Sequence, residues 1–271
     1  MFFMVLISWL CFLVSDYVIW WSVFVVSTVI FVFLMSGAMA GSSLIQYYLI
    51  QEVCGYFFLI LGGSLSLFVL MMKSGSAPLH FWIFSIVSFL RGSSLVWFLT
   101  VQKLPYFFVM LVFLGGVFFY FLFSGMLVCY LQFFFLRFWN NMVLVASTES
   151  FNWLLMLGCL VSSGVFFLSL VYYFVMLFII GFSYGGDSFM NWEMLLIFFN
   201  TPFCVTFLLK VMVLVFFVQF NFFVLLLLLF MPLISLGIVF WFMYNMFVGV
   251  NLGAKSVLGF FLFPLMVLVF F

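Results

Sequence analysis

Five charged side chains lie in the middle of long apolar segments, where they could take up and release protons. They are Glu52, Lys73, Lys103, Glu149 and Lys210. Placing one charge near the centre of a bilayer costs at least about 2.5–3.5 kcal/mol. Ion pairs that only hold helices together are the alternative, but buried pairs add little net stability over apolar residues. We therefore expect these residues to form a proton or ion path.

The spacing around Lys73 predicts a carboxylate partner and a relay. Burial disfavours the charged form of a lysine and a nearby carboxylate favours it, so a moving partner can switch the proton on and off. Glu52 and Lys73 each lie ten residues from the Gly62-Gly63 turn, which places both about 15 Å from the same membrane surface. His80 follows Lys73 by seven residues and could relay protons near neutral pH if the helix continues; the alternative is a purely structural histidine.

Two of the segments that carry lysines also contain helix-breaking residues. Gly75 and Pro78 follow Lys73, and Pro202 precedes Lys210. Proline removes a backbone donor and kinks or breaks a helix. Interrupted spans in both halves of a chain are typical of inverted-repeat transporters, with simple kinks as the alternative. Glu149 is a further candidate for the path, either tuning Lys103 or Lys210 or satisfying a polar neighbour.

The composition requires a membrane protein to position these residues. The chain has 271 residues, of which 71% are hydrophobic and 4% are charged, whereas about a quarter of the residues in a soluble domain are charged. Runs such as Phe222–Met231 do not alternate as a β-barrel strand would. We predict an all-α, polytopic transmembrane helix bundle of ten or eleven spans, with antiporter-like inverted repeats and two interrupted helices.

The expected spans form a single transmembrane domain over residues 1–271. Most cover about the 20 residues or more that a helix needs to cross the hydrocarbon core, while the first and last segments are shorter. The expected segments are Met1–Val14 (short), Tyr17–Met35, Leu44–Leu61, Ser64–Ile86, Leu95–Leu114, Val117–Phe135, Met142–Leu160, Ser162–Phe182, Trp192–Gln219, Phe222–Val248 and Val257–Phe271.

Other features of the composition exclude several functions. A net charge of +1 argues against a nucleic-acid partner. The five cysteines are scattered singly and the chain has one histidine, so we expect no metal or iron–sulfur site. No cationic leader precedes the first apolar run, so neither a signal peptide nor a transit peptide is expected.

Two motifs resemble those of a known family. Lys73-Ser-Gly-Ser-Ala-Pro-Leu-His-Phe-Trp82 resembles the Lys-x-Gly-x-Ala-Pro-Phe-His-Phe-Trp motif of subunit 2 of NADH–ubiquinone oxidoreductase, an antiporter-like, mitochondrially encoded subunit of respiratory complex I. Leu99-Thr100-Val101-Gln102-Lys103-Leu104 resembles its Leu-Thr-x-Gln-Lys segment. A third segment, Thr201–Lys210, is similar in weaker form to its Pro-Pro-x-x-Gly-Phe-x-x-Lys segment, with Thr206 in place of the glycine.

The resemblance implies a function for the whole chain. Lys73, Lys103 and Lys210 would form a central proton pathway, driven by redox chemistry in other subunits. NADH, FMN, iron–sulfur clusters and ubiquinone would be bound by those other subunits, with no cofactor in this chain. Its partners would be other membrane-arm subunits, including sister antiporter-like subunits, together with membrane lipids. Its location would be the mitochondrial inner membrane, as a multi-pass protein.

The sequence departs from the family at one acidic position. Animal members carry a glutamate in the helix that corresponds to Tyr17–Met35, paired with the first lysine, whereas Val25 lies near that position here. We hypothesise that Glu52 supplies the missing carboxylate.

Two other functions stay open from the sequence. One is a stand-alone cation/proton antiporter, although such antiporters are longer and usually add carboxylates. The other is a membrane scaffold that conducts nothing, which unbroken spans with charges only at their ends would favour.

Overall fold

The computed structural model describes residues 2–37, 39–90, 93–136 and 138–160. The chain divides into two compact units, Met1–Phe189 and Met190–Phe271, and all of the described residues belong to the first. The described part is helical and contains no strand, as the apolar runs predict. The segments expected after Leu160, together with Pro202 and Lys210, lie outside the described residues.

The first three helices follow the apolar segments. They are α1 (Phe2–Leu13), α2 (Tyr17–Met35) and α3 (Gly41–Ile60). The bounds of α2 confirm the predicted span. Helix α3 begins three residues before the predicted Leu44, so the loop expected over Ser36–Ser43 is shorter than predicted.

The predicted span Ser64–Ile86 is broken in the structure. Helix α4 covers Leu65–Ser74 and α5 covers only Ile83–Val87. Gly75 ends α4 with φ 61° and ψ 45°, a left-handed conformation that a residue without Cβ adopts readily. The break therefore begins directly after Lys73 and Ser74.

The next predicted span, Leu95–Leu114, is confirmed as the stretch Ser94–Phe113, which contains a 3₁₀ turn. It consists of α6 (Ser93–Thr100), the 3₁₀ turn η1 (Val101–Lys103) and α7 (Leu104–Phe113). Pro105 has no N–H to donate to the Val101 carbonyl four residues earlier. Leu104 donates to that carbonyl instead, which tightens the turn that carries Lys103.

Two long helices complete the described part: α8 (Gly116–Phe135) and α9 (Trp139–Leu160). Four helical stretches are long and apolar enough to cross a membrane, namely Tyr17–Met35, Gly41–Ile60, Ser94–Phe113 and Asn140–Cys159. The described residues thus support a polytopic helical membrane protein. The total of ten or eleven spans and the inverted repeats stay predictions.

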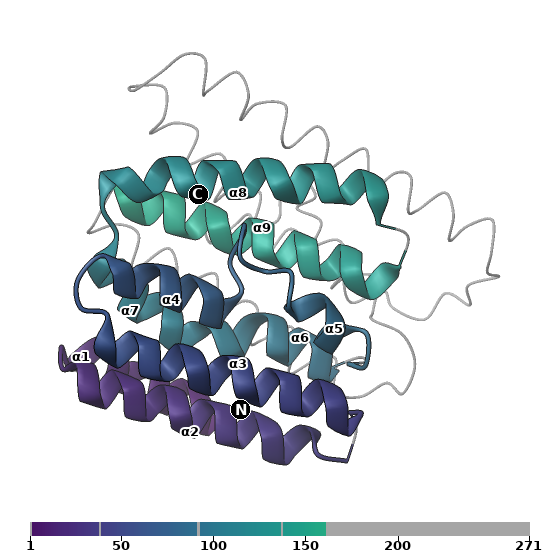
Figure 1. The fold of residues 1–271 in the computed structure, drawn as a ribbon, viewed down its shortest axis with the longest axis horizontal. Helices are drawn as coiled ribbons and strands as arrows, with labels where there is room; N and C mark the ends of the chain where they lie inside the picture. The colour runs from purple at the N-terminus through teal and green to yellow at the C-terminus, as the bar shows by residue number, and fades with distance from the viewer. Residues whose placement is uncertain (1, 38, 91–92, 137, 161–271) are drawn as a thin grey trace, which may run out of the picture. The chain divides into compact units, whose positions relative to one another are not determined.

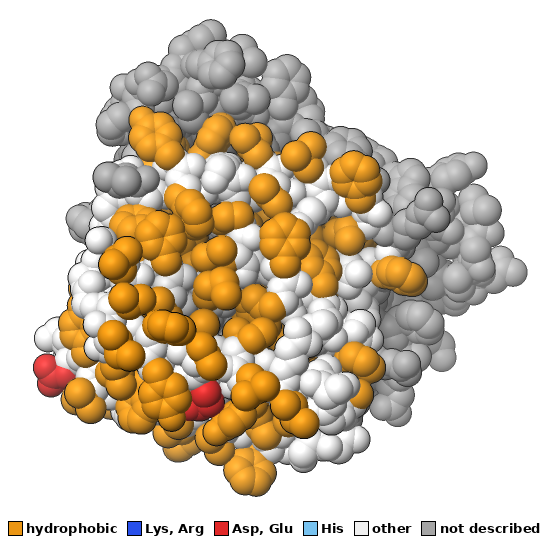
Figure 2. Space-filling model, viewed as in Figure 1, with side chains coloured by type: hydrophobic (Ala, Val, Ile, Leu, Met, Phe, Trp, Pro, Cys, Tyr) orange, Lys and Arg blue, Asp and Glu red, His pale blue; other side chains and the backbone are white. Residues whose placement is uncertain are grey.

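Burial separates inner from outer helices. Within an 18-residue apolar window of each stretch, 89% of the residues are buried in Ser94–Phe113 and in Asn140–Cys159, against 39% in α2 and 33% in α3. In Figure 1, α4 to α7 lie between α3 and the α8–α9 pair. Hydrophobic side chains cover much of the face seen in Figure 2. An apolar outer face around a polar interior is the arrangement expected for a protein in lipid.

Candidate functional site

The end of α4 positions Lys73 at a break whose backbone groups are well satisfied. The last carbonyls of a helix have no partner within it. Here the Met71 carbonyl accepts from the Ser76 N–H at 3.0 Å, and the Met72 carbonyl accepts from Trp82 Nε1 at 3.0 Å. The Lys73 carbonyl accepts from Gln51 Nε2 of α3 at 2.9 Å. The break is therefore an ordered structure rather than a frayed helix end.

Helices α8 and α9 hold the other side of the break. Asn152 Nδ2 of α9 donates to the Ala77 carbonyl at 3.1 Å. A Cβ on Gly125 of α8 would lie 2.3 Å from the same carbonyl oxygen, so only glycine permits this close approach. Pro78 follows directly in this segment. The backbone around Ala77 is therefore fixed by contacts with two neighbouring helices.

Lys73 is enclosed by aromatic rings. Its side chain is 2% exposed. Its Nζ lies 5.0 Å from the centre of the Phe24 ring and 5.9 Å from that of Tyr106. Among the described residues, no acid forms an ion pair with it. The amine is therefore inside the protein and faces aromatic surfaces.

Glu52 lies near Lys73 without contacting it. The acid is half-buried on α3, one residue after the Gln51 that donates to the Lys73 carbonyl, and it interacts electrostatically with Lys73. Cys54, two residues further along α3, also interacts electrostatically with Lys73. Within the described residues, Glu52 can thus influence the charge of Lys73 but is not its salt-bridge partner.

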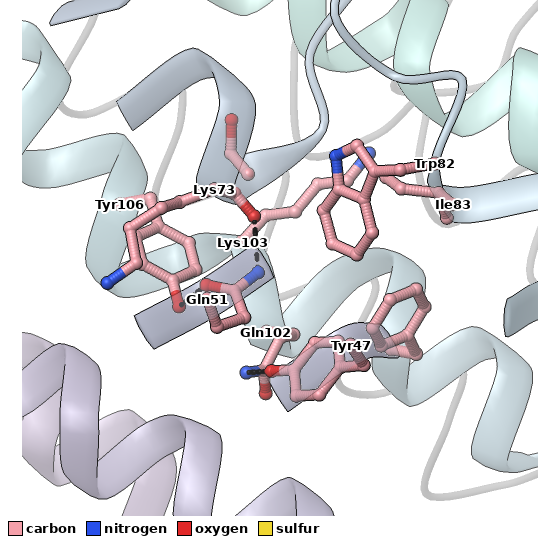
Figure 3. A pocket seen from close by; sticks show the side chains of 10 residues that line it. Tyr47, Gln51, Lys73, Trp82, Ile83, Gln102, Lys103 and Tyr106 are labelled. Carbon is pink, nitrogen blue, oxygen red and sulfur yellow. Dashed lines mark hydrogen bonds between the residues drawn. The ribbon is translucent and has the colours of Figure 1, made fainter. Parts of the chain in front are cut away.

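A small cavity connects the surroundings of Lys73 and Lys103. Its lining includes both lysines, two glutamines and two tyrosines, and it has room for about one water molecule. Figure 3 shows the two lysine side chains extending in different directions at this cavity. The residues that line it are Tyr47, Gln51, Lys73, Ser74, Trp82, Ile83, Phe98, Gln102, Lys103 and Tyr106.

The polar side chains of this cavity form two short hydrogen-bonded groups (Figure 3). Tyr106 donates from its hydroxyl to Gln51 Oε1 at 3.3 Å, and Gln102 Nε2 donates to the Tyr47 hydroxyl at 2.8 Å. We did not predict these four residues from the sequence. Gln51 directly precedes Glu52 and Gln102 directly precedes Lys103, so polar residues beside charged ones inside spans were the signal that could have identified them.

Lys103 is buried at the other side of the cavity. It is the last residue of η1, is 4% exposed, and its Nζ lies 5.1 Å from the centre of the Phe151 ring of α9. Its Nζ has no hydrogen-bond partner among the described residues. A lysine in such a setting can gain or lose a proton when its neighbours change.

His80 lies beyond the end of α4, so the seven-residue spacing from Lys73 does not follow one helix and the condition for a shared face is not met. His80 Nε2 hydrogen-bonds Gln132 Oε1 of α8 at 2.6 Å, and the ring interacts electrostatically with Lys103. The role of His80 as a relay stays a prediction.

Glu149 forms a separate polar group between α8 and α9. It is fully buried, and its Oε1 accepts hydrogen bonds from the Tyr130 hydroxyl and, at 3.3 Å, from Trp153 Nε1. Cys129 Sγ and Thr148 Oγ1, one residue before Tyr130 and Glu149, lie 3.7 Å apart. Glu149 therefore has hydrogen-bond donors on both helices. Whether it also tunes Lys103 or Lys210 stays a prediction.

The described residues contain no group of three or more His, Cys, Asp or Glu side chains that could hold a metal ion. No disulfide joins the cysteines among them, which are Cys11, Cys54, Cys129 and Cys159. What the site does offer is two buried amines, a histidine and hydrogen-bonding side chains around a small cavity. Such a set is suited to proton transfer.

Comparison with known proteins found two relatives of high similarity. A protein named NADH-ubiquinone oxidoreductase chain 2 from Ascaris suum is 42% identical over 220 residues, which cover 79% of this chain and 73% of the relative. A protein of the same name from Caenorhabditis elegans is 38% identical over 213 residues, covering 77% of this chain and 75% of the relative. No protein-family model matches the chain.

Proposed function

The chain belongs to the NADH-ubiquinone oxidoreductase chain 2 family, and we propose that it carries protons across the membrane as a core subunit of respiratory complex I. The observation that carries this proposal is the shared cavity, because two buried lysines from different helical elements line it together with Gln51 and Tyr106. A subunit that only held its neighbours together would gain nothing from burying two amines there.

Lys73 and Lys103 are the proton-carrying groups of this proposal. Each amine takes up a proton as an ammonium ion and releases it as the surrounding charges change. Gln51 and Tyr106 orient acceptor and donor groups at the cavity between the lysines. Glu52 adjusts the charge of Lys73 from outside contact distance.

The path extends beyond these two lysines. His80 serves the Lys103 side, where it interacts electrostatically with that amine. Lys210 would continue the line, as the family resemblance implies, and lies outside the described residues with its helix-breaking Pro202. Glu149 accepts hydrogen bonds from Tyr130 and Trp153. Its part in the path would be to tune the electrostatic potential around Lys103.

The energy for transport would come from outside the chain. We assign NADH, FMN, the iron–sulfur clusters and ubiquinone to other subunits of the complex. This chain would be a multi-pass protein of the mitochondrial inner membrane, packed against sister antiporter-like subunits and lipids. Conformational or charge changes passed along the membrane arm would then shift protons at the lysines.

Replacing Lys73 with methionine tests this function in membrane vesicles that contain the assembled complex. Methionine keeps the length and apolar stem of the side chain but cannot hold a proton. Proton transport driven by NADH should fall at least about ten-fold, since a positioned acid–base group contributes at least that much. The matched control is Asp16→Asn, which also removes one charge but at an exposed helix end.

The other outcomes identify the competing functions. Normal transport by Lys73→Met in a normally assembled complex would contradict the proposal. Loss of assembly without any separate loss of transport per assembled complex would support a scaffold. Cation-dependent proton exchange by the isolated chain, with no NADH present, would support a stand-alone antiporter.

A further inference from the structure

The amine of Lys73 faces two aromatic rings, a feature that its role as a proton carrier does not itself require. Its amine is buried, makes no ion pair with a described acid and lies within cation–π range of two rings. We propose that Phe24 and Tyr106 are positioning residues that form an aromatic seat for the charged form of Lys73. This inference rests on the proposed function, in which Lys73 carries a proton.

The two rings make a corner around the amine. Phe24 comes from α2 and Tyr106 from α7, and their centroids lie 4.8 Å apart with ring planes inclined by 41°. Both side chains are buried. Because cation–π attraction is stronger at buried sites than at exposed ones, the two ring faces offset part of the cost of burying the charged amine.

Neighbouring groups fix the seat in place. The Tyr106 hydroxyl donates to Gln51 Oε1 at 3.3 Å and lies 3.4 Å from Ser27 Oγ, which sets the orientation of the ring. On α3, a Cβ added to Gly55 would lie 3.4 Å from Lys73 Nζ, so the amine lies close to the backbone of this helix. The amine is thus bounded by α2, α3 and α7.

An aromatic seat differs from a carboxylate because it stabilises the ammonium ion without being able to accept its proton. The face of a phenylalanine stabilises a cation but has no basic atom that could accept its proton. The seat can therefore keep Lys73 charged without competing for the proton, which leaves the cavity as the route of release. This arrangement separates holding the charge from accepting the proton.

Other ionisable groups also face Lys73 and must be counted in any test by pH. Helix α3 provides Glu52 and Cys54, α7 provides the Tyr106 hydroxyl, and η1 provides Lys103 across the cavity. Among the described residues of α2, the ring of Phe24 faces Lys73 and the indole of Trp21 lies close to Gly55 of α3. Neither side chain is an acid or a base. Removing the ring at position 24 therefore changes the seat and leaves each of these ionisable groups in place.

The first test replaces Phe24 with leucine in the assembled complex and follows NADH-driven proton transport as a function of pH. Without one ring face the ammonium gives up its proton more easily, so the alkaline limb of the profile should move down by about half to one pH unit. Phe31→Leu is the matched control, because Phe31 is an equally buried phenylalanine of the same helix whose ring neighbours are Tyr47, Trp97 and Phe98.

A second pair separates the ring of Tyr106 from its hydroxyl. Tyr106→Phe keeps the ring face but loses the hydroxyl contacts, so it should lower transport while moving the alkaline limb less than Tyr106→Leu, which should move it in the same direction as Phe24→Leu. If Phe24→Leu does not assemble, the Tyr106 pair still decides the question. An unchanged alkaline limb in Tyr106→Leu, or an equal shift in Phe31→Leu, would overturn the aromatic seat.

The Lys73→Met variant shows which proposal has failed. If Lys73→Met loses transport while the ring variants keep their profiles, Lys73 carries protons and the seat is wrong. If Lys73→Met transports normally, the proposed function fails. Any effect of the ring variants then cannot arise from a proton carried by Lys73.

Discussion

Both described lysines lie against aromatic rings instead of carboxylates. Lys73 faces Phe24 and Tyr106, and Lys103 faces Phe151. A salt bridge fixes a charge strongly and needs a large change to release it, whereas a ring holds an ammonium ion by about 0.5–2 kcal/mol. Weak holding suits a group that must give up its proton in each cycle.

Gly75 provides the sharpest prediction for a single residue. Its φ of 61° is unfavourable for any side chain, and a Cβ there would lie 1.7 Å from Ile83 Cδ1. Gly75→Ala should lower the stability of the assembled complex by about 1–2 kcal/mol or more from the backbone conformation alone. The measurement is thermal unfolding of the purified complex, with the amount assembled in the membrane as a second readout.

Gly62→Ala is the control for that substitution, since Gly62 has no positive φ and a methyl group added there would meet no atom within 4 Å. Equal stability of the two variants would show that the left-handed turn after α4 does not fix the position of Lys73.

The break between α4 and α5 is the element that organises the site, and the helix pair α8–α9 holds it. Asn152 of α9 donates to the Ala77 carbonyl, and Gly125 of α8 allows the backbone to approach that same carbonyl. His80, just beyond, hydrogen-bonds Gln132 of α8. A shift of α8 would therefore change the contacts both of the break and of His80.

Gly125→Ala should disturb this contact. Its methyl carbon would lie 2.3 Å from the Ala77 oxygen and 2.9 Å from the Pro78 nitrogen, which are backbone atoms that cannot rotate away. We expect reduced proton transport per assembled complex together with lower thermal stability, by about 1–3 kcal/mol as for other overpacked positions.

Gly116→Ala, at the start of the same helix with no atom within 4 Å of the added carbon, should behave as the unchanged protein. Transport and stability of Gly125→Ala at the level of Gly116→Ala would mean that α8 can move without affecting the break.

The helices themselves could be predicted from the sequence to a large extent. Uninterrupted apolar length gave α2 within its observed bounds, and Gly75 with Pro78 marked the break. Pro105 carried the signal for the 3₁₀ turn at Lys103, because a missing N–H leaves a defined carbonyl without its usual partner.

The tertiary neighbours could not be predicted in the same way. Once α4 ends, helical periodicity no longer says where His80 points, and its contact with Gln132 joins segments 52 residues apart. The rings of Phe24 and Tyr106 around Lys73 come from α2 and α7 for the same reason. In a chain with 49 phenylalanines, no local pattern distinguishes the rings that face a buried amine, such as Phe24.

At the scale of the whole molecule, the described part of the chain has apolar side chains on its more exposed helices and ionisable groups in its interior. The described helices with the greatest burial are those that carry Lys103 and Glu149. Both lysines in the described part are buried, and Asp16 lies exposed at a helix end. Charge inside and apolar side chains outside is the reverse of a soluble protein and is the form expected of a membrane subunit with an internal path.

The shared cavity makes one claim central: Lys73 and Lys103 act in series on the same protons. Residues that act as one unit give strongly non-additive losses when removed together, whereas independent sites add. The direct measurement is protons transported per NADH oxidised in vesicles that carry Lys73→Met, Lys103→Met or both. A serial path predicts that each single variant falls to the level of the double variant. Partial losses in the single variants that add up in the double would contradict it.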